Sequence, residues 1–136
     1  MVIDASFVAA VLLEETHTAF VRAAFDDLAA EDLHAPALLP FELANILRTR
    51  TRKGELDNVR RSMLLSYSER LEVEIAAAPE GERMERILAV ADRHGLTAYD
   101  AAYLEAALRL QADLATLDRS LAAAGRAEGL RVHAPF

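Results

Sequence analysis

Four acidic residues share one kind of position, because each stands where an apolar or turn-like segment gives way to a helical one. They are Asp4, Glu42, Asp100 and Asp118. Carboxylate oxygens are the ligands that hard divalent cations prefer, and Mg²⁺ keeps several of its waters, so an open group of acids suffices to hold it. Two such ions roughly 4 Å apart can activate water and stabilise the oxygen that departs from a phosphodiester. If the fold gathers these four acids, their chemistry suits phosphodiester hydrolysis.

Each acid taken alone also has a purely structural explanation. Asp4 and Asp118 directly precede helical segments, where aspartate is a favoured N-cap. Glu42 would place a negative charge near the positive end of a helix. Asp100 follows Thr97 by three residues, which is close to the spacing of a capping box, although aspartate is shorter than the usual glutamate. Capping explains any single acid, and the shared position of all four favours a metal site.

The composition is typical of a folded protein. The chain has 136 residues, of which 53% are hydrophobic and 27% charged, so we expect a single domain over residues 1–136. It contains no cysteine, which excludes disulfides, thiolate metal sites and cysteine nucleophiles and is compatible with the cytoplasmic location that we expect. The net charge of −7 argues against a protein that coats nucleic acid. It does not exclude a nucleic-acid enzyme, because metal-binding acids are themselves negative.

Nothing in the sequence predicts a membrane segment. An acid stands at position 4 with no basic leader before it, so no signal peptide is expected. The longest uncharged runs, Ala5–Leu13 and Leu33–Phe41, have nine residues each and are too short to span a bilayer. We therefore expect a soluble protein.

Short apolar segments alternate with helical segments along the chain. Strands are expected at Val2–Asp4, Leu33–Ala37, Leu71–Ile75, Asp113–Leu117 and Leu130–His133. Helices are expected at Ala5–Glu14, His17–Ala30, Pro40–Lys53, Asp57–Ser68, Glu80–His94, Thr97–Gln111 and Asp118–Ala127. This alternation predicts a parallel sheet with helices on both faces, in which ligands bind beyond the carboxyl ends of the strands, near the point where strand order reverses. Asp4 and Asp118 belong to that edge.

Apolar spacing also predicts how some of these segments are buried. Helical spacing places Met84, Ile87, Leu88 and Ala91 on an inward face. The segment Leu71–Ile75 alternates apolar and acidic residues, which predicts a half-exposed strand at the edge of the sheet.

Four segments carry a resemblance to a known family. They are Val2–Ser6, Pro40–Asn45, Gly95–Tyr103 and Ala115–Arg119. In this order they resemble the PIN-domain ribonucleases, and specifically the VapC-type toxins of prokaryotic toxin–antitoxin modules, over nearly the whole chain. The resemblance implies a PIN-like three-layer α/β/α domain with a central, mainly parallel sheet of four to five short strands.

The resemblance also implies a chemistry for the four acids. The protein would be a metal-dependent endoribonuclease that cleaves single-stranded or looped RNA by a two-metal mechanism. Asp4 and Asp100 would be direct ligands of Mg²⁺, with Mn²⁺ as the other metal to consider. Glu42 and Asp118 would bind the second metal or act through water.

Five further residues are candidates for supporting roles. Ser6 and Thr116 match hydroxyl positions beside the family's site, where they would orient water or a carboxylate. Asn45 lies one helical turn after the acid of its own helix and would face the same way. Plain capping or packing is an equal alternative for these three. Arg48 and Arg52 share a helical face and would contact RNA phosphates, although favourable charge near a helix C-terminus also explains them.

The resemblance implies two protein partners and leaves alternatives open. A cognate VapB-like antitoxin would thread into the active-site groove, and a second copy would form a homodimer. A non-toxin RNA-processing nuclease and a catalytically silent interaction domain of the same fold stay open. A receiver-like switch fits poorly because the sole lysine, Lys53, lies on a mid-chain helix. A haloacid-dehalogenase-type phosphatase would need a second aspartate where Ser6 stands.

Overall fold

The centre of the molecule is a five-stranded sheet in which every pair of neighbouring strands is parallel. The computed structural model describes residues 1–13, 19–20, 23 and 32–136. The strands are β1 (Val2–Ile3), β2 (His34–Ala35), β3 (Glu74–Ile75), β4 (Leu114–Ala115) and β5 (Val132–His133), in the order β3-β2-β1-β4-β5. In the register of the central pair, Val2 lies opposite Leu114 and Ile3 opposite Ala115.

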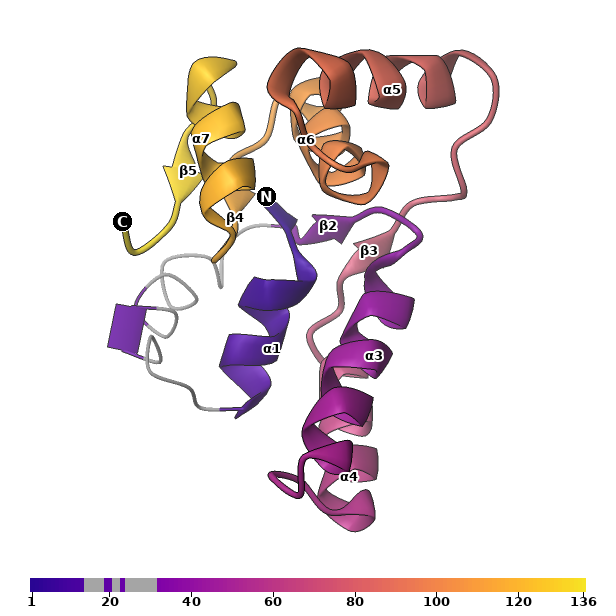
Figure 1. Cartoon of the computed structure of the whole chain (residues 1–136), viewed down its shortest axis with the longest axis vertical. Helices are drawn as coiled ribbons and strands as arrows, with labels where there is room; N and C mark the ends of the chain where they lie inside the picture. Colours follow the sequence, from indigo (N-terminus) through magenta and orange to yellow (C-terminus); the bar gives the residue numbers. More distant parts are fainter. Residues whose placement is uncertain (14–18, 21–22, 24–31) are drawn as a thin grey trace.

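Helices cover both faces of this sheet (Figure 1). They are α1 (Ala5–Leu13), α3 (Leu39–Arg52), α4 (Asn58–Glu69), α5 (Glu82–His94), α6 (Ala98–Leu110) and α7 (Arg119–Ala127). One face carries α1, α3 and α4, and the other carries α5, α6 and α7. The expected three-layer α/β/α architecture with a parallel sheet is therefore confirmed.

The strand order reverses between β1 and β4. From β1 the chain moves to β2 and then β3 on one side, whereas from β4 it moves to β5 on the other side. In open α/β sheets the outgoing connections diverge at such a reversal and form a crevice beyond the carboxyl ends of the two strands, which here are β1 and β4. Asp4 directly follows β1, and Thr116 directly follows β4.

Small residues allow close packing around this crevice. In α6 all seven residues from Ala101 to Ala107 are buried, four of them alanines, and α6 packs against β1, β4, α5 and α7. The start of α1 is equally enclosed, with Phe7 fully buried. The most deeply buried helices therefore begin beside the carboxyl ends of the central strands. None of the described helices is long and apolar enough to cross a membrane.

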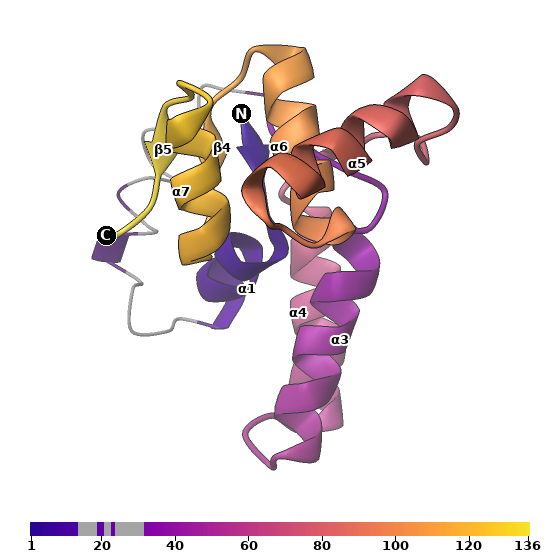
Figure 2. The same ribbon diagram turned by 45° about the horizontal axis from the view of Figure 1, so that its top comes forward.

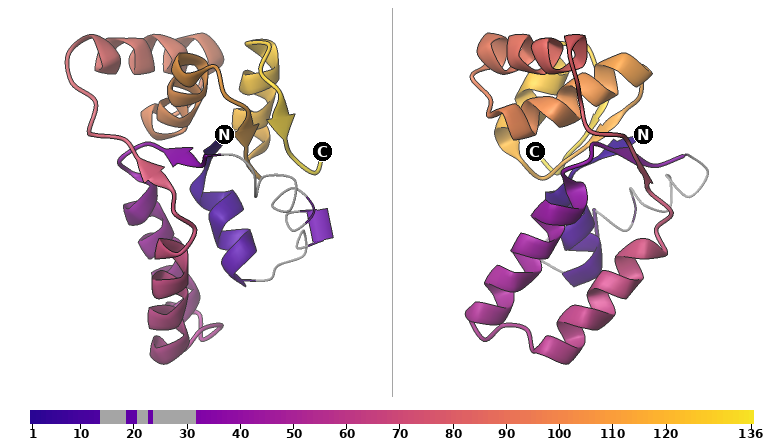
Figure 3. Two further views of the ribbon diagram at one scale, coloured as in Figure 1. Left: turned by 180° about the vertical axis from the view of Figure 1, so that it is seen from behind. Right: turned by 90° about the vertical axis from the view of Figure 1, so that its right-hand side faces the viewer.

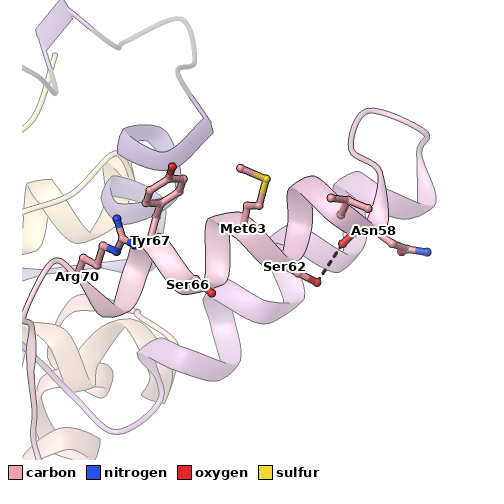
Figure 4. Close-up of a pocket in the computed structure, with 7 residues that line it drawn as sticks. Asn58, Ser62, Met63, Ser66, Tyr67 and Arg70 are labelled. Carbon is pink, nitrogen blue, oxygen red and sulfur yellow. Dashed lines mark hydrogen bonds between the residues drawn. The ribbon is translucent and has the colours of Figure 1, made fainter.

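The α3–α4 pair extends away from the rest of the molecule. The two helices run side by side as a hairpin (Figures 2 and 3). Only Leu64 of α4 is buried, while Val59, Met63 and Tyr67 are exposed. Met63 and Tyr67 project beside a surface hollow of about 670 Å³ on α4 (Figure 4). The lining of this hollow includes none of the candidate acids.

The expected elements are found with small shifts of their ends. Each strand is shorter than expected, and the helix expected at His17–Ala30 lies outside the described residues except at positions 19, 20 and 23. The strand β3 lies at the sheet edge, as its alternation predicts. The prediction that Met84 and Leu88 face inward is wrong, because they are 40% and 44% exposed. Val90 is buried instead, which turns the inward face of α5 toward α6.

Candidate active site

Asp4 is the most enclosed of the four acids, with an exposed fraction of 5%. Its Oδ1 accepts a hydrogen bond from the Phe7 backbone N–H at 2.8 Å and one from the Ser6 hydroxyl at 2.7 Å. Its Oδ2 accepts from the Thr116 hydroxyl at 2.5 Å. The bond from Phe7 is the capping interaction expected of an aspartate before a helix. Asp4 therefore both caps α1 and lies at the carboxyl end of the central strand β1.

Ser6 and Thr116 connect the two central strand ends around Asp4. The Ser6 hydroxyl accepts from the Leu117 backbone N–H at 2.9 Å, across the crevice. The fully buried Thr116 hydroxyl accepts from the Asp118 backbone N–H at 2.9 Å. Both hydroxyls thus donate to the Asp4 carboxylate and accept from the β4–α7 connection, so they orient this carboxylate rather than merely pack beside it.

Glu42 lies in the first turn of α3 and is half-buried. Its Oε2 accepts a hydrogen bond of 2.5 Å from the phenol of Tyr103, which is 2% exposed on α6. Tyr103 is not among the site residues predicted from the sequence. One available signal was its spacing, because it follows Asp100 by three residues and so shares a helical face with that acid.

Asp100 and Asp118 both lie at the starts of helices. The Thr97 hydroxyl caps α6 by accepting from the Asp100 backbone N–H at 3.1 Å, and it donates to Asp100 Oδ2 at 2.7 Å. Asp118 caps α7 by accepting from the Leu121 backbone N–H at 2.7 Å. Asp100 is partly exposed and Asp118 is exposed. Each of these carboxylates keeps an oxygen that makes no described hydrogen bond to the protein, so capping leaves it able to bind a ligand.

Burial and like charge raise the pKa values of the two inner acids. Burial raises the pKa of Asp4, and its three hydrogen bonds oppose this effect, while the charge of Asp118 adds to the increase. Burial also raises the pKa of Glu42, against the hydrogen bond from Tyr103, and the charges of Asp4 and Asp100 raise it further. The negative charges of the neighbouring acids therefore act on both Asp4 and Glu42.

The described part of the chain offers these acids no compensating cation. No lysine, arginine or histidine within it lies at ion-pair distance from any of the four. Carboxylates gathered without a basic partner repel one another, and a bound divalent cation would relieve that repulsion.

The donor set fits Mg²⁺ or Mn²⁺ as an open, hydrated site. Among the described residues, no three histidine, aspartate or glutamate side chains already stand close enough to enclose a metal ion. Mg²⁺ does not need such a cage, because it is usually bound through one or two carboxylates and retains water. A set made only of carboxylates is also the type that hard cations prefer.

The remaining candidates lie along the exposed side of α3. Asn45 is exposed one turn after Glu42, as its spacing predicts. Arg48 and Arg52 are exposed farther along the helix and form no described ion pair with the acids. The structure thus gathers the acids and the two hydroxyls around the crevice, but it does not join the arginines to them.

Comparisons with known proteins show which family this chain is similar to. The family model described as PIN domain matches residues 1–127. Ribonuclease VapC3 of Pyrobaculum aerophilum is 33% identical over 122 residues, which are 90% of this chain and 92% of that protein. The crystal structure of PAE2754 from Pyrobaculum aerophilum aligns over 96% of this chain and 87% of its own, with a TM-score of 0.72 and 26% identity. VapC20 of Mycobacterium tuberculosis, described as a sarcin-ricin loop cleaving toxin, aligns over 91% of this chain and 94% of its own, with a TM-score of 0.69 and 14% identity.

Proposed function

The chain belongs to the PIN-domain family, in its VapC-type branch, and from that premise we propose that it is a divalent-metal-dependent endoribonuclease that serves as the toxin of a toxin–antitoxin pair. The observation that carries the proposal is Asp4. It is a buried carboxylate at the reversal of strand order and is held by three donors, and no described basic group lies at ion-pair distance from it or from the other three acids. A ligand-free structural role would not require so much uncompensated negative charge in one place.

In this proposal Asp4 and Asp100 hold the metal directly, and Glu42 and Asp118 hold a second ion or act through water. Bound Mg²⁺ or Mn²⁺ would supply charge neutralisation at the phosphodiester and an activated water. The protein's own contribution is orientation. The hydroxyls of Ser6 and Thr116 fix the Asp4 carboxylate. Oriented ligands lower the cost of reorganisation when the substrate arrives.

We propose RNA as the substrate and the exposed side of α3 as part of its path. Arg48 and Arg52 are exposed on the helix that begins at Glu42, so they can meet phosphates of a strand whose scissile bond lies at the acids. We also propose that residues 1–136 act as one domain in the cytoplasm, where RNA and a reducing environment are present.

The first experiment exposes a mixed cellular RNA pool to the purified protein with Mg²⁺, with Mn²⁺ or with EDTA. We expect discrete fragments with either metal and none with EDTA, because the carboxylates alone cannot neutralise the phosphodiester. If a small reading frame neighbours the gene, a further sample receives an equimolar amount of the protein that it encodes, which should suppress cleavage if it is a VapB-like antitoxin.

Two other outcomes of this experiment would each favour one of the alternative functions. Metal-dependent fragments that the neighbouring gene product does not suppress would favour an RNA-processing nuclease. No cleavage by folded, metal-loaded protein would favour a silent interaction domain.

We propose that a second copy of the chain binds through an apolar face beside the acids. Phe41 and Tyr99, which directly precede Glu42 and Asp100, are 79% and 67% exposed. With Met84 and other apolar residues they line a hollow of about 320 Å³ between α3, α5 and α6. Exposed apolar surface of this kind is typical of a protein–protein contact.

Light scattering coupled to size-exclusion chromatography tests this homodimer. We expect the unmodified protein to show twice the 14.9 kDa of one chain. The double substitution Phe41→Ser and Tyr99→Ser should reduce the mass to that of a monomer, whereas Val59→Ser, at an equally exposed residue on α4, should not. A monomeric unmodified protein, or a dimer that survives the double substitution, would contradict the proposal.

A further inference from the structure

We infer that Tyr103 is a positioning residue of the active site, whose hydroxyl holds the Glu42 carboxylate in place and joins it to the strand end that carries Asp4. The inference rests on the proposed function, since it concerns the use of the same acids. Tyr103 touches neither substrate nor metal in this account. It acts through Glu42.

The Tyr103 side chain reaches the crevice from inside the protein. It is 2% exposed and belongs to α6, whose first turn carries Asp100. Its hydroxyl donates to Glu42 Oε2 on α3, 61 residues away in sequence. The backbone N–H of Ala5, the residue after Asp4, interacts with the same hydroxyl oxygen. One phenol therefore joins the three chain segments that carry Asp4, Glu42 and Asp100.

The chemistry of the hydroxyl matches this position. A phenol has a single O–H to donate, and here it goes to a carboxylate, so its oxygen is left to accept from the backbone. A hydrogen bond to an ionised acceptor is shorter and stronger than one between neutral groups. With Oε2 engaged, Glu42 has one oxygen left, and the bond to Tyr103 restricts the orientations in which the side chain can present it.

Side-chain hydroxyl groups also hold two other acids of the crevice by donating hydrogen bonds to them. The Thr116 and Ser6 hydroxyls donate to Asp4, and the Thr97 hydroxyl donates to Asp100. Glu42 has a longer and more flexible side chain than aspartate, and its partner is the longest of the hydroxyl side chains. Loss of a hydrogen-bond partner of a metal-binding carboxylate typically weakens metal affinity by about 10- to 100-fold.

The substitution Tyr103→Phe removes the hydroxyl and keeps the ring that fills the core. Calorimetric titration of the RNA-free protein with Mn²⁺ should show an affinity about 10- to 100-fold weaker than that of the unmodified protein. The rate of RNA cleavage at subsaturating Mn²⁺ should fall with it and recover partly at high Mn²⁺. Tyr67→Phe makes the same chemical change at a 46% exposed residue of α4, and it should leave both values unchanged.

The variant Glu42→Gln shows whether Tyr103 positions Glu42 or only stabilises the fold. In Glu42→Gln protein, Tyr103→Phe should cause little additional loss of Mn²⁺ affinity, because the group that it positions has been altered. Equal loss in both backgrounds, or a lower melting temperature with unchanged Mn²⁺ affinity, would show that Tyr103 only stabilises the fold. If the unmodified protein neither binds Mn²⁺ nor cleaves RNA, the proposed function fails and this inference fails with it; if it does both and Tyr103→Phe matches it, the inference alone is wrong.

Discussion

Replacing Asp4 with asparagine should lower the rate of RNA cleavage by on the order of a thousandfold and leave the fold intact. A divalent metal contributes several kcal/mol to stabilising the charge of the transition state, and each 1.4 kcal/mol or so is a factor of ten in rate. Asparagine has nearly the same shape as aspartate but lacks the charge that would bind the metal. Its carbonyl oxygen can still accept from the Phe7 backbone N–H, and the Thr116 hydroxyl can turn to accept from its amide.

Initial rates of fragment formation at saturating Mg²⁺ provide the measurement, with circular dichroism to establish folding. Asp100→Asn should cause a loss of similar size, because we propose it as the other direct ligand. Asp92→Asn is the matched control, since it removes one carboxylate from an exposed position on α5 whose charge is not among those that raise the pKa values of Asp4 and Glu42. A folded Asp4→Asn protein that retains more than about a tenth of the rate would exclude Asp4 as a metal ligand.

Topology explains why the central part of the site could be predicted from sequence. Asp4 and Asp118 follow short apolar segments, and parallel strands bring their carboxyl ends to one edge of a sheet whatever lies between them in the chain. The observed pairing of β1 with β4 places these ends together. The hydroxyls of Ser6 and Thr116 are next to those ends, so their contacts with Asp4 follow from the same rule.

Contacts between distant helix faces could not be predicted in this way. The partner of Glu42 lies 61 residues away, and no local spacing specifies which side chain of α6 meets α3. Periodicity gave the wrong inward face for Met84 and Leu88 for a related reason. An apolar stripe shows which side of a helix would benefit from burial, but not whether the fold provides a cover for it. In α5 the fold buries Ile87 and Ala91 of that stripe and leaves Met84 and Leu88 exposed.

The second large effect expected is on stability, because Mn²⁺ should raise the melting temperature of the protein. A ligand that binds only the folded state at a concentration of 100 times its dissociation constant adds about 2.7 kcal/mol, which corresponds to a shift of roughly 5–10 °C for a chain of this size. The acids have no described basic partner, so the metal would relieve repulsion that the metal-free protein retains. Differential scanning calorimetry with and without Mn²⁺ measures the shift.

The Mn²⁺-induced increase in melting temperature should depend on pH, and the direction of this dependence follows from the raised pKa values of Asp4 and Glu42. Because these two acids bind protons more tightly in the folded protein than in the unfolded chain, they stabilise the metal-free fold below their unfolded pKa values, and that stabilisation is lost as the pH rises through the raised ones. Metal competes with those protons, so the Mn²⁺-induced increase in melting temperature should be larger at about pH 7.5 than at about pH 5.

In Asp4→Asn protein both the increase and its pH dependence should shrink, whereas Asp92→Asn should behave like the unmodified protein. An Mn²⁺-induced increase that is the same at both pH values, or that persists undiminished in Asp4→Asn, would mean that the metal binds somewhere other than these acids.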